Sequence, residues 1–186
     1  MLVGKGNDLR HHCIRTMRKK YLNYCLRNTR YQKVTYKSGM SLALTGDIVM
    51  ASDTAYFLQA FAKIGLVPDG GATWYLPRLI GWGRAMELSM LAERLPASEA
   101  LSWGLVNRVV PEAELEAASM AMAQRLASGP KSLGLIRKAY WASWENDFNK
   151  QMQLEADLQT EAHASADNRE GVAAFLEKRP AVFTGQ

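Results

Sequence analysis

The chain has 186 residues, of which 48% are hydrophobic and 22% charged, so it is long enough to bury one substantial core. This composition excludes global disorder, and no apolar stretch reaches the length of a membrane span. We therefore expect a globular protein that does not enter a membrane. Cys13 and Cys25 have neither the spacing of a disulfide framework nor that of a metal site, which favours the reducing cytoplasm and predicts no bound metal.

The net charge of +5 is concentrated at the start of the chain. Residues 1–37 carry ten Lys and Arg against the single acid Asp8, a net charge of +9, which leaves −4 for the remainder. Tyrosines lie between these cations, an arrangement that would suit an arm for RNA. We favour a solvated basic extension instead, because blocks of like charge are usually solvated. A nucleic-acid partner is therefore not expected.

Short apolar runs begin at residue 38 and indicate α/β structure. A Gly-containing turn leads into a short helix over 40–44, which we expect Gly46 to end in the left-handed conformation. Residues 47–51 and 55–59 are rich in β-branched or aromatic side chains and predict two short strands. Ser, Asp and Thr between them are typical of a turn.

Helices dominate from the next loop onward. A Gly- and Pro-containing loop over 64–71 precedes a predicted helix over 72–80, which Pro77 should kink or break. Further helices are expected over 82–93 and 96–103.

A strand predicted over 105–110 separates these helices from a longer helical region. We expect that region to contain four helices, over 112–127, 131–143, 145–164 and 167–178. The predicted organisation is a basic segment (1–37), an α/β portion (38–111) and an all-α portion (112–186). Several large apolar residues of the last portion should form core or subunit contacts, namely Met120, Met122, Trp141, Trp144, Phe148 and Met152.

Four sequence blocks, in this order, carry a resemblance to a known family: 38–47, 57–71, 100–111 and 170–180. Together they resemble the crotonase superfamily, which is the enoyl-CoA hydratase/isomerase family. The resemblance implies a partial spiral of β-β-α turns, followed by an all-α region that assembles a trimer or a dimer of trimers. It also implies an acyl-CoA thioester as substrate and no separate cofactor, because coenzyme A is part of that substrate.

The resemblance further implies a catalytic site that stabilises a thioester enolate with backbone N–H donors. One donor falls at Ser38 or Gly39. The positions that carry two Glu in hydratases are Ser41 and Phe61, neither of which can take a proton, so hydration is disfavoured. Asp69 falls where isomerases of the family place an acid, and it is the candidate base for a proton alpha or gamma to the thioester. From the residues alone, its Pro-Asp-Gly-Gly sequence is a turn in which Asp binds local N–H groups, and this alternative remains open.

The resemblance implies substrate contacts at Met40, Phe61, Pro68, Gly70, Gly71 and Lys178. Lys178, with Arg179 beside it, matches a position whose cation meets a CoA phosphate; the alternative is an ordinary solvated helix end. The segments 39–41 and 67–71 look closest to the ring-epoxide isomerases of phenylacetyl-CoA degradation.

The first half of the family pattern, including the loop with the other oxyanion donor, has no counterpart in residues 1–37. We expect this segment to be a replacement, for example from a shifted reading frame. Loss of one donor in comparable sites costs about 2.7 to 4 kcal/mol of transition-state stabilisation. The activity that the resemblance implies is acyl-CoA double-bond or ring isomerisation with Asp69 as the acid/base. The alternatives are hydration or an impaired fragment that acts as an oligomerising or binding module.

Overall fold

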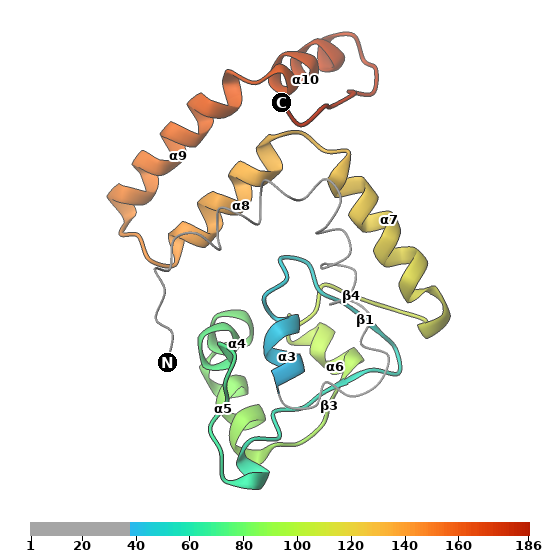
Figure 1. Ribbon diagram of the computed structural model, residues 1–186, viewed down its shortest axis with the longest axis vertical. Coiled ribbons are helices and arrows are strands. Elements are labelled where there is room, and N and C mark those ends of the chain that lie inside the picture. Colours follow the sequence, from blue (N-terminus) through green and yellow to red (C-terminus); the bar gives the residue numbers. More distant parts are fainter. Residues whose placement is uncertain (1–37) are drawn as a thin grey trace, which may run out of the picture. The chain divides into compact units, whose positions relative to one another are not determined.

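The computed structural model describes residues 38–186 (Figure 1). The RNA-arm alternative and the replacement predicted for residues 1–37 lie outside the described residues. The described chain divides into two compact units, one ending at Ala123 and one beginning at Gln124. Each unit is considered by itself below, and the three-part domain organisation stays a prediction.

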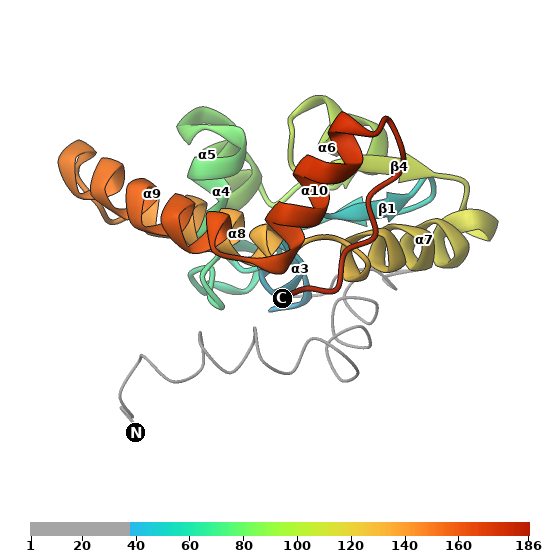
Figure 2. The ribbon, with the colours of Figure 1, turned by 90° about the horizontal axis from the view of Figure 1, so that it is seen from above.

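Short paired strands form the framework of the first unit. β1 (Met50–Ser52) runs parallel to β4 (Arg108–Val110), with Met50 opposite Arg108, and Figure 2 shows the two strands side by side. β2 (Tyr56–Phe57) pairs antiparallel with β3 (Leu95–Pro96). The Asn107 side chain accepts a hydrogen bond from the Val49 N–H at 2.7 Å, which extends the β1–β4 connection by one residue.

Four α-helices pack around these strands: α3 (Ser38–Ala43), α4 (Ala72–Ile80), α5 (Trp82–Leu91) and α6 (Ala97–Ser102). Gly81 separates α4 from α5 and has a φ of 79°. Gly adopts this conformation without strain because it has no Cβ. Because apolar residues recur every three or four positions, both helices turn one face to the core. The buried cluster includes Leu76, Ile80, Ala85 and Leu88 from these two helices.

The remaining elements of the first unit are the 3-10 helices η1 (Ala62–Ile64) and η2 (Glu112–Glu114) and the start of α7 (Leu115–Ala127). The Glu112 N–H donates to the Asp53 carboxylate at 3.0 Å, and Thr54 donates to the Glu112 carboxylate at 2.7 Å. These bonds fasten the turn after β1 to the chain that leaves β4.

The second unit contains α8 (Ser132–Ser143), α9 (Phe148–His163) and α10 (Ala166–Leu176). Side-chain caps set the starts of the last two helices. Asp147 accepts from the Lys150 N–H at 2.9 Å, and Ser165 accepts from the Asn168 N–H at 3.0 Å. Each cap satisfies one of the N–H groups that a helix start leaves without an intrahelical acceptor.

The structure confirms mixed α/β content followed by helices, and it corrects several details. The first helix begins at Ser38 instead of 40. Gly46 does not adopt a positive φ; its N–H instead donates to the Ala43 carbonyl at 3.2 Å in an ordinary turn. α4 continues through Pro77 without a break. β3 was not predicted, because its two residues become a strand only by pairing with β2.

Two of the large apolar residues for which core or subunit contacts are expected lie outside the core of the second unit. Phe148 is 76% exposed and Met152 is 50% exposed. Whether they form subunit contacts stays a prediction. Over the described range, no helix combines the length and the apolar character needed to cross a bilayer.

Candidate functional site

The helix α3 and the turn that carries Asp69 lie against each other in the first unit. A Cβ placed on Gly70 would be 2.9 Å from the Cβ of Ser41, a separation that real Cβ atoms essentially never show. The turn therefore approaches α3 as closely as it does only because residue 70 has no side chain. Ser41 and Gly70 are nearly thirty positions apart. The two segments that contain them, both predicted to belong to the site, are brought together in this way.

The backbone from Asp69 to α4 has a shape that favours Gly. Gly70 and Gly71 have φ angles of 61° and 84°, values that residues with a Cβ rarely adopt. The Ala72 N–H donates to the Asp69 carbonyl at 3.1 Å, and the helix continues from there. Asp69 itself is exposed. The Pro-Asp-Gly-Gly sequence is thus a turn, as its composition indicates, and the turn leads directly into α4.

Ser38 and Gly39, the predicted oxyanion donors, are the first two residues of α3. The N–H groups in the first turn of an α-helix have no acceptor within the helix. This position is compatible with donation to a ligand, and the donor role itself stays a prediction.

Two predicted substrate contacts, Met40 and Phe61, are buried in the first unit. The Gln59 amide donates to the Met40 sulfur at 3.6 Å, which links α3 to the chain after β2. The Phe61 carbonyl accepts from the N–H groups of Ile64 and Leu66. Pro68 is half-buried next to Asp69. The substrate contacts of all these residues stay predictions.

Sequence reasoning missed two buried polar groups beside these residues. Ser41 and Gln59 are both 0% exposed, and within the described part of the chain the Ser41 hydroxyl and the Gln59 amide oxygen have no hydrogen-bond partner. A buried polar atom without a partner costs free energy, since it has lost its hydrogen bonds to water. The sequence signal for such groups is a polar residue within an apolar run. This signal can indicate a buried polar side chain, but it does not show whether that side chain has a hydrogen-bond partner.

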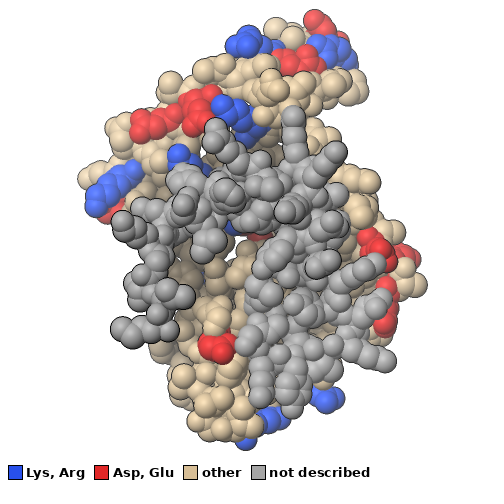
Figure 3. Space-filling view, in the orientation of Figure 1, with Lys and Arg blue, Asp and Glu red and all other residues tan. Residues whose placement is uncertain are grey.

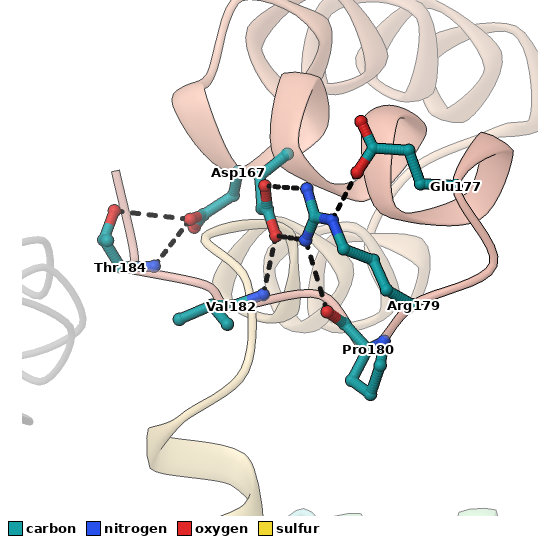
Figure 4. A network of polar contacts seen from close by, with 7 residues as sticks. Asp167, Glu177, Arg179, Pro180, Val182 and Thr184 are labelled. Atoms are coloured by element: carbon teal, nitrogen blue, oxygen red, sulfur yellow. Dashed lines mark hydrogen bonds and ion pairs between the residues drawn. The ribbon is translucent and has the colours of Figure 1, made fainter.

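Lys178, the predicted phosphate contact, lies in the second unit just after α10. It is exposed and has a φ of 54°. The neighbouring Arg179 donates to both carboxylate oxygens of Glu170, at 2.6 and 3.0 Å, and to Glu177 at 2.6 Å (Figure 4). Hydrogen bonds from Arg179 and from the Val182 N–H lower the pKa of Glu170 to about 2. The same carboxylates raise the pKa of Arg179 above its usual value.

A buried carboxylate, that of Asp167, holds the C-terminal residues. Asp167 accepts from the Thr184 N–H at 2.7 Å and from the Lys131 N–H at 2.8 Å. Burial acts to raise the pKa of Asp167, but the N–H groups of Thr184, Lys131 and Gly185 outweigh it and the pKa is lowered. Asp167, Glu170 and Arg179 were not predicted as a network. The two acids near the start of the last helix and the Arg after its end are the available signal.

Charge in the described residues does not gather into a basic surface on the face that Figure 3 shows. Lys and Arg are interspersed there with Asp and Glu over α9 and α10. Within the described range, no group of three or more His, Cys, Asp or Glu is arranged to hold a metal ion.

Comparison with known proteins gives one consistent result. The family model described as Enoyl-CoA hydratase/isomerase matches residues 35–186. A "Probable enoyl-CoA hydratase" of Rhodobacter capsulatus is 47% identical over 150 residues, which are 80% of this chain and 58% of that protein. The "1,2-epoxyphenylacetyl-CoA isomerase" of Escherichia coli is 46% identical over 150 residues, which are 80% of this chain and 57% of that protein.

Solved structures agree with these relatives. The crystal structure of an enoyl-CoA hydratase from Bacillus anthracis is 33% identical, with a TM-score of 0.76, over 80% of this chain and 58% of that one. An enoyl-CoA hydratase/isomerase from Cupriavidus metallidurans is 34% identical, also with a TM-score of 0.76, over 88% and 67% of the two chains. The chain therefore has the fold of these proteins and spans about 58% of the length of the curated relatives.

Proposed function

Because the chain belongs to the enoyl-CoA hydratase/isomerase family, we propose that it acts on an acyl-CoA thioester and moves a double bond, or rearranges a ring, through a thioester enolate. Asp69 is the proposed acid/base, and the backbone N–H of Ser38 or Gly39 is one proposed donor to the thioester oxygen. The relative named 1,2-epoxyphenylacetyl-CoA isomerase supports a place among the ring-epoxide isomerases and hence in phenylacetate breakdown.

The observation that carries this proposal is the close approach of α3 to the Asp69 turn. Gly70 lies against Ser41 at a separation that admits no side chain, so the residues proposed as donor and base belong to segments in direct contact. A reaction that needs charge stabilisation at the thioester oxygen and proton removal two or more atoms away requires both groups close together.

The proposed reaction needs one carboxylate. The Asp69 carboxylate takes a proton from the carbon alpha or gamma to the thioester, and the electron pair left behind becomes the enolate. The N–H donors stabilise the negative charge on the thioester oxygen. Asp69 then returns the proton to a different carbon and is again a carboxylate, so no external acid or base is consumed.

Hydration is the second candidate, supported by the relatives whose names include enoyl-CoA hydratase. The residues argue against it, because Ser41 and Phe61 stand where hydratases carry Glu, and both side chains are buried. The third candidate is a piece with little catalysis that oligomerises or binds. It is supported by the share of the relatives' length that this chain spans.

We propose a homo-oligomer, a trimer or a dimer of trimers, in the cytoplasm. Support for assembly comes from large apolar side chains exposed on the second unit, among them Phe148, Phe175, Leu176 and Val182, since apolar surface of this kind is typical of interfaces. Support for the cytoplasm comes from the two Cys, which are too few for a disulfide framework.

The proposed activity is tested by incubating the purified chain with a 3-enoyl-CoA and following the 2-enoyl isomer and the 3-hydroxyacyl product by chromatography. We expect isomer without hydroxyacyl product, and loss of turnover in Asp69→Asn with CoA binding retained. The exposed Glu93→Gln serves as a control for removal of a carboxylate. Hydroxyacyl product would favour hydration, binding without turnover would favour the binding module, and undiminished turnover in Asp69→Asn would refute the assignment of the base.

A further inference from the structure

Lys178 holds a backbone conformation that is unusual for its residue type. Among the residues the structure describes, only Ala92 and Lys178 combine a side chain with a positive φ, at 52° and 54°. Ala92 directly follows the end of α5, and Lys178 is the second residue after the end of α10. Gly is the usual residue at such positions, because a Cβ strains this backbone conformation. A strained residue persists only where its surroundings fix it, and such strain is common at functional positions.

The backbone around Lys178 is fixed by hydrogen bonds to the last turn of α10. The Arg179 N–H donates to the Ala174 carbonyl at 3.0 Å, and the Lys178 N–H donates to the Phe175 carbonyl at 3.3 Å. The first of these is the long-range bond of a Schellman motif, which requires the left-handed residue at position 178. The chain thus turns sharply at Lys178 and leaves its side chain at the surface.

The side chain of Arg179 fastens both sides of this turn. Its guanidinium bonds both oxygens of Glu170 within α10, and Glu177 just before the turn. Glu170 also accepts from the Val182 N–H at 2.9 Å, three residues after Arg179. Figure 4 shows the guanidinium bonded to Glu177 and to the Pro180 carbonyl, and the Val182 N–H directed at the carboxylate that the guanidinium also bonds. The planar fork of Arg suits such bidentate bonding, which Lys cannot reproduce.

The same network engages the carboxylate next to Lys178 in the sequence, Glu177, and that of Glu170 in the last helix. Glu170 and Glu177 are each paired with Arg179, and no ion pair of Lys178 occurs among the described residues. Without Arg179, either carboxylate could attract the Lys178 ammonium by direct charge pairing. Arg179 therefore leaves this ammonium available to an anion from outside the chain.

We propose that Arg179 is a positioning residue: by engaging Glu170 and Glu177, it holds Lys178 in its left-handed conformation and presents the ammonium to a phosphate of coenzyme A. This inference rests on the proposed acyl-CoA function. It adds to that function a residue that acts through Lys178 and does not itself touch the ligand.

A double-mutant cycle on the full chain tests the proposal, with CoA as the probe and calorimetry as the readout. Lys178→Met should weaken CoA binding about ten- to a hundredfold, as expected for a lost charge-assisted hydrogen bond. Arg179→Met should weaken it nearly as much, and the double variant should bind no more weakly than Lys178→Met. Arg179→Lys keeps the charge but not the planar fork of the guanidinium. Its affinity for CoA should lie between that of Arg179→Met and that of the unsubstituted chain.

The outcomes separate this proposal from the proposed function. If the loss of CoA affinity in the double variant equals the product of the losses in the two single variants, Arg179 acts independently of Lys178. That result would overturn the positioning role alone. Retained affinity in Lys178→Met would do the same. Absence of CoA binding by the unsubstituted chain would overturn both. Circular dichroism of each variant checks that the second unit remains folded.

A substitution by Gly provides the complementary test. Lys178→Gly relieves the backbone strain, so the melting temperature should rise while CoA affinity falls. Ala92→Gly changes the other left-handed residue, which is buried in the first unit, and should leave CoA affinity unchanged. Equal effects of the two variants on CoA affinity would contradict the assigned role of Lys178 and Arg179.

Discussion

The hydroxyl of Ser41 is buried beneath the Asp69 turn, with no hydrogen-bond partner among residues 38–186. An unsatisfied buried polar group costs about 1 to 3 kcal/mol, so Ser41→Ala should raise the free energy of unfolding by about 1 kcal/mol. Ser52→Ala is the matched control. Ser52 is equally buried, but its hydroxyl bonds to Thr54 at 3.1 Å, so its loss should be destabilising. Urea unfolding measures both, and destabilisation by Ser41→Ala would contradict the missing partner.

Gly70 allows a second residue-level prediction. Ala at this position would meet both a left-handed backbone, with φ of 61°, and the Cβ of Ser41. Gly65 has a similar φ of 69° but nothing within 4 Å of an added Cβ. Gly65→Ala should therefore cost only the backbone strain, about 1 to 2 kcal/mol, and Gly70→Ala should cost clearly more. Equal melting temperatures of the two variants would mean that α3 does not lie against the turn.

Sequence reasoning succeeded at this scale where backbone chemistry is local. Pro-Asp-Gly-Gly indicates a turn through its own composition, and the turn is present with both Gly at positive φ. Burial is a property of the surroundings, so nothing in the local sequence could indicate that the Ser41 hydroxyl and the Gln59 amide oxygen lack partners among the described residues. The network around Arg179 was equally hidden, because its members are separated by up to twelve positions and meet only after α10 has formed.

At the scale of elements, the last helix and the chain after it depend on ionised carboxylates. The pKa of Glu170 is lowered from 4.5 to about 2 by Arg179 and the Val182 N–H. Between these values the unfolded chain binds a proton that the folded chain does not, so stability falls as the pH drops from about 4.5 toward 2.

Glu170→Gln removes this contribution. The unfolding free energy of the unsubstituted chain should decrease more steeply over that pH range than that of Glu170→Gln, and the difference between them should be constant above pH 6. Urea unfolding at a series of pH values measures the two slopes. Parallel curves would contradict the lowered pKa of Glu170.

Helices were predicted better than strands, for a physical reason. α4 has the predicted bounds because Gly residues with positive φ stand on both sides of it. The strands are only two or three residues long and exist through pairing between distant segments, such as β1 with β4. The start of α9 was predicted three residues early, because the Asp147 side chain caps the helix at Phe148.

At the scale of the whole molecule, the proposed assembly would cover exposed apolar residues of the second unit. Phe175 is 82% exposed on α10, and Phe175→Glu would place a charge in any interface that covers it. We expect this variant to sediment as a smaller species than the unsubstituted chain. Gln159→Glu, at an exposed polar position of α9, is the control for added charge. Identical sedimentation of all three proteins would refute the proposed interface at Phe175.

The family was predictable from the sequence because its four blocks lie in order along one chain, and the match to residues 35–186 confirms it. The activity was harder to predict from the sequence than the family. One reason is that catalysis depends on the relative position of a base and an oxyanion donor, which the sequence does not give. The other is that the chain spans only about 58% of the length of its curated relatives.

Proton exchange at the acyl chain tests the role of Asp69 most directly. A saturated acyl-CoA is incubated with the protein in deuterated water, and mass spectrometry measures deuterium at the carbon alpha to the thioester. We predict that the unsubstituted chain accelerates the incorporation of deuterium at this carbon and that Asp69→Asn does not. Equal incorporation with both proteins would contradict Asp69 as the base.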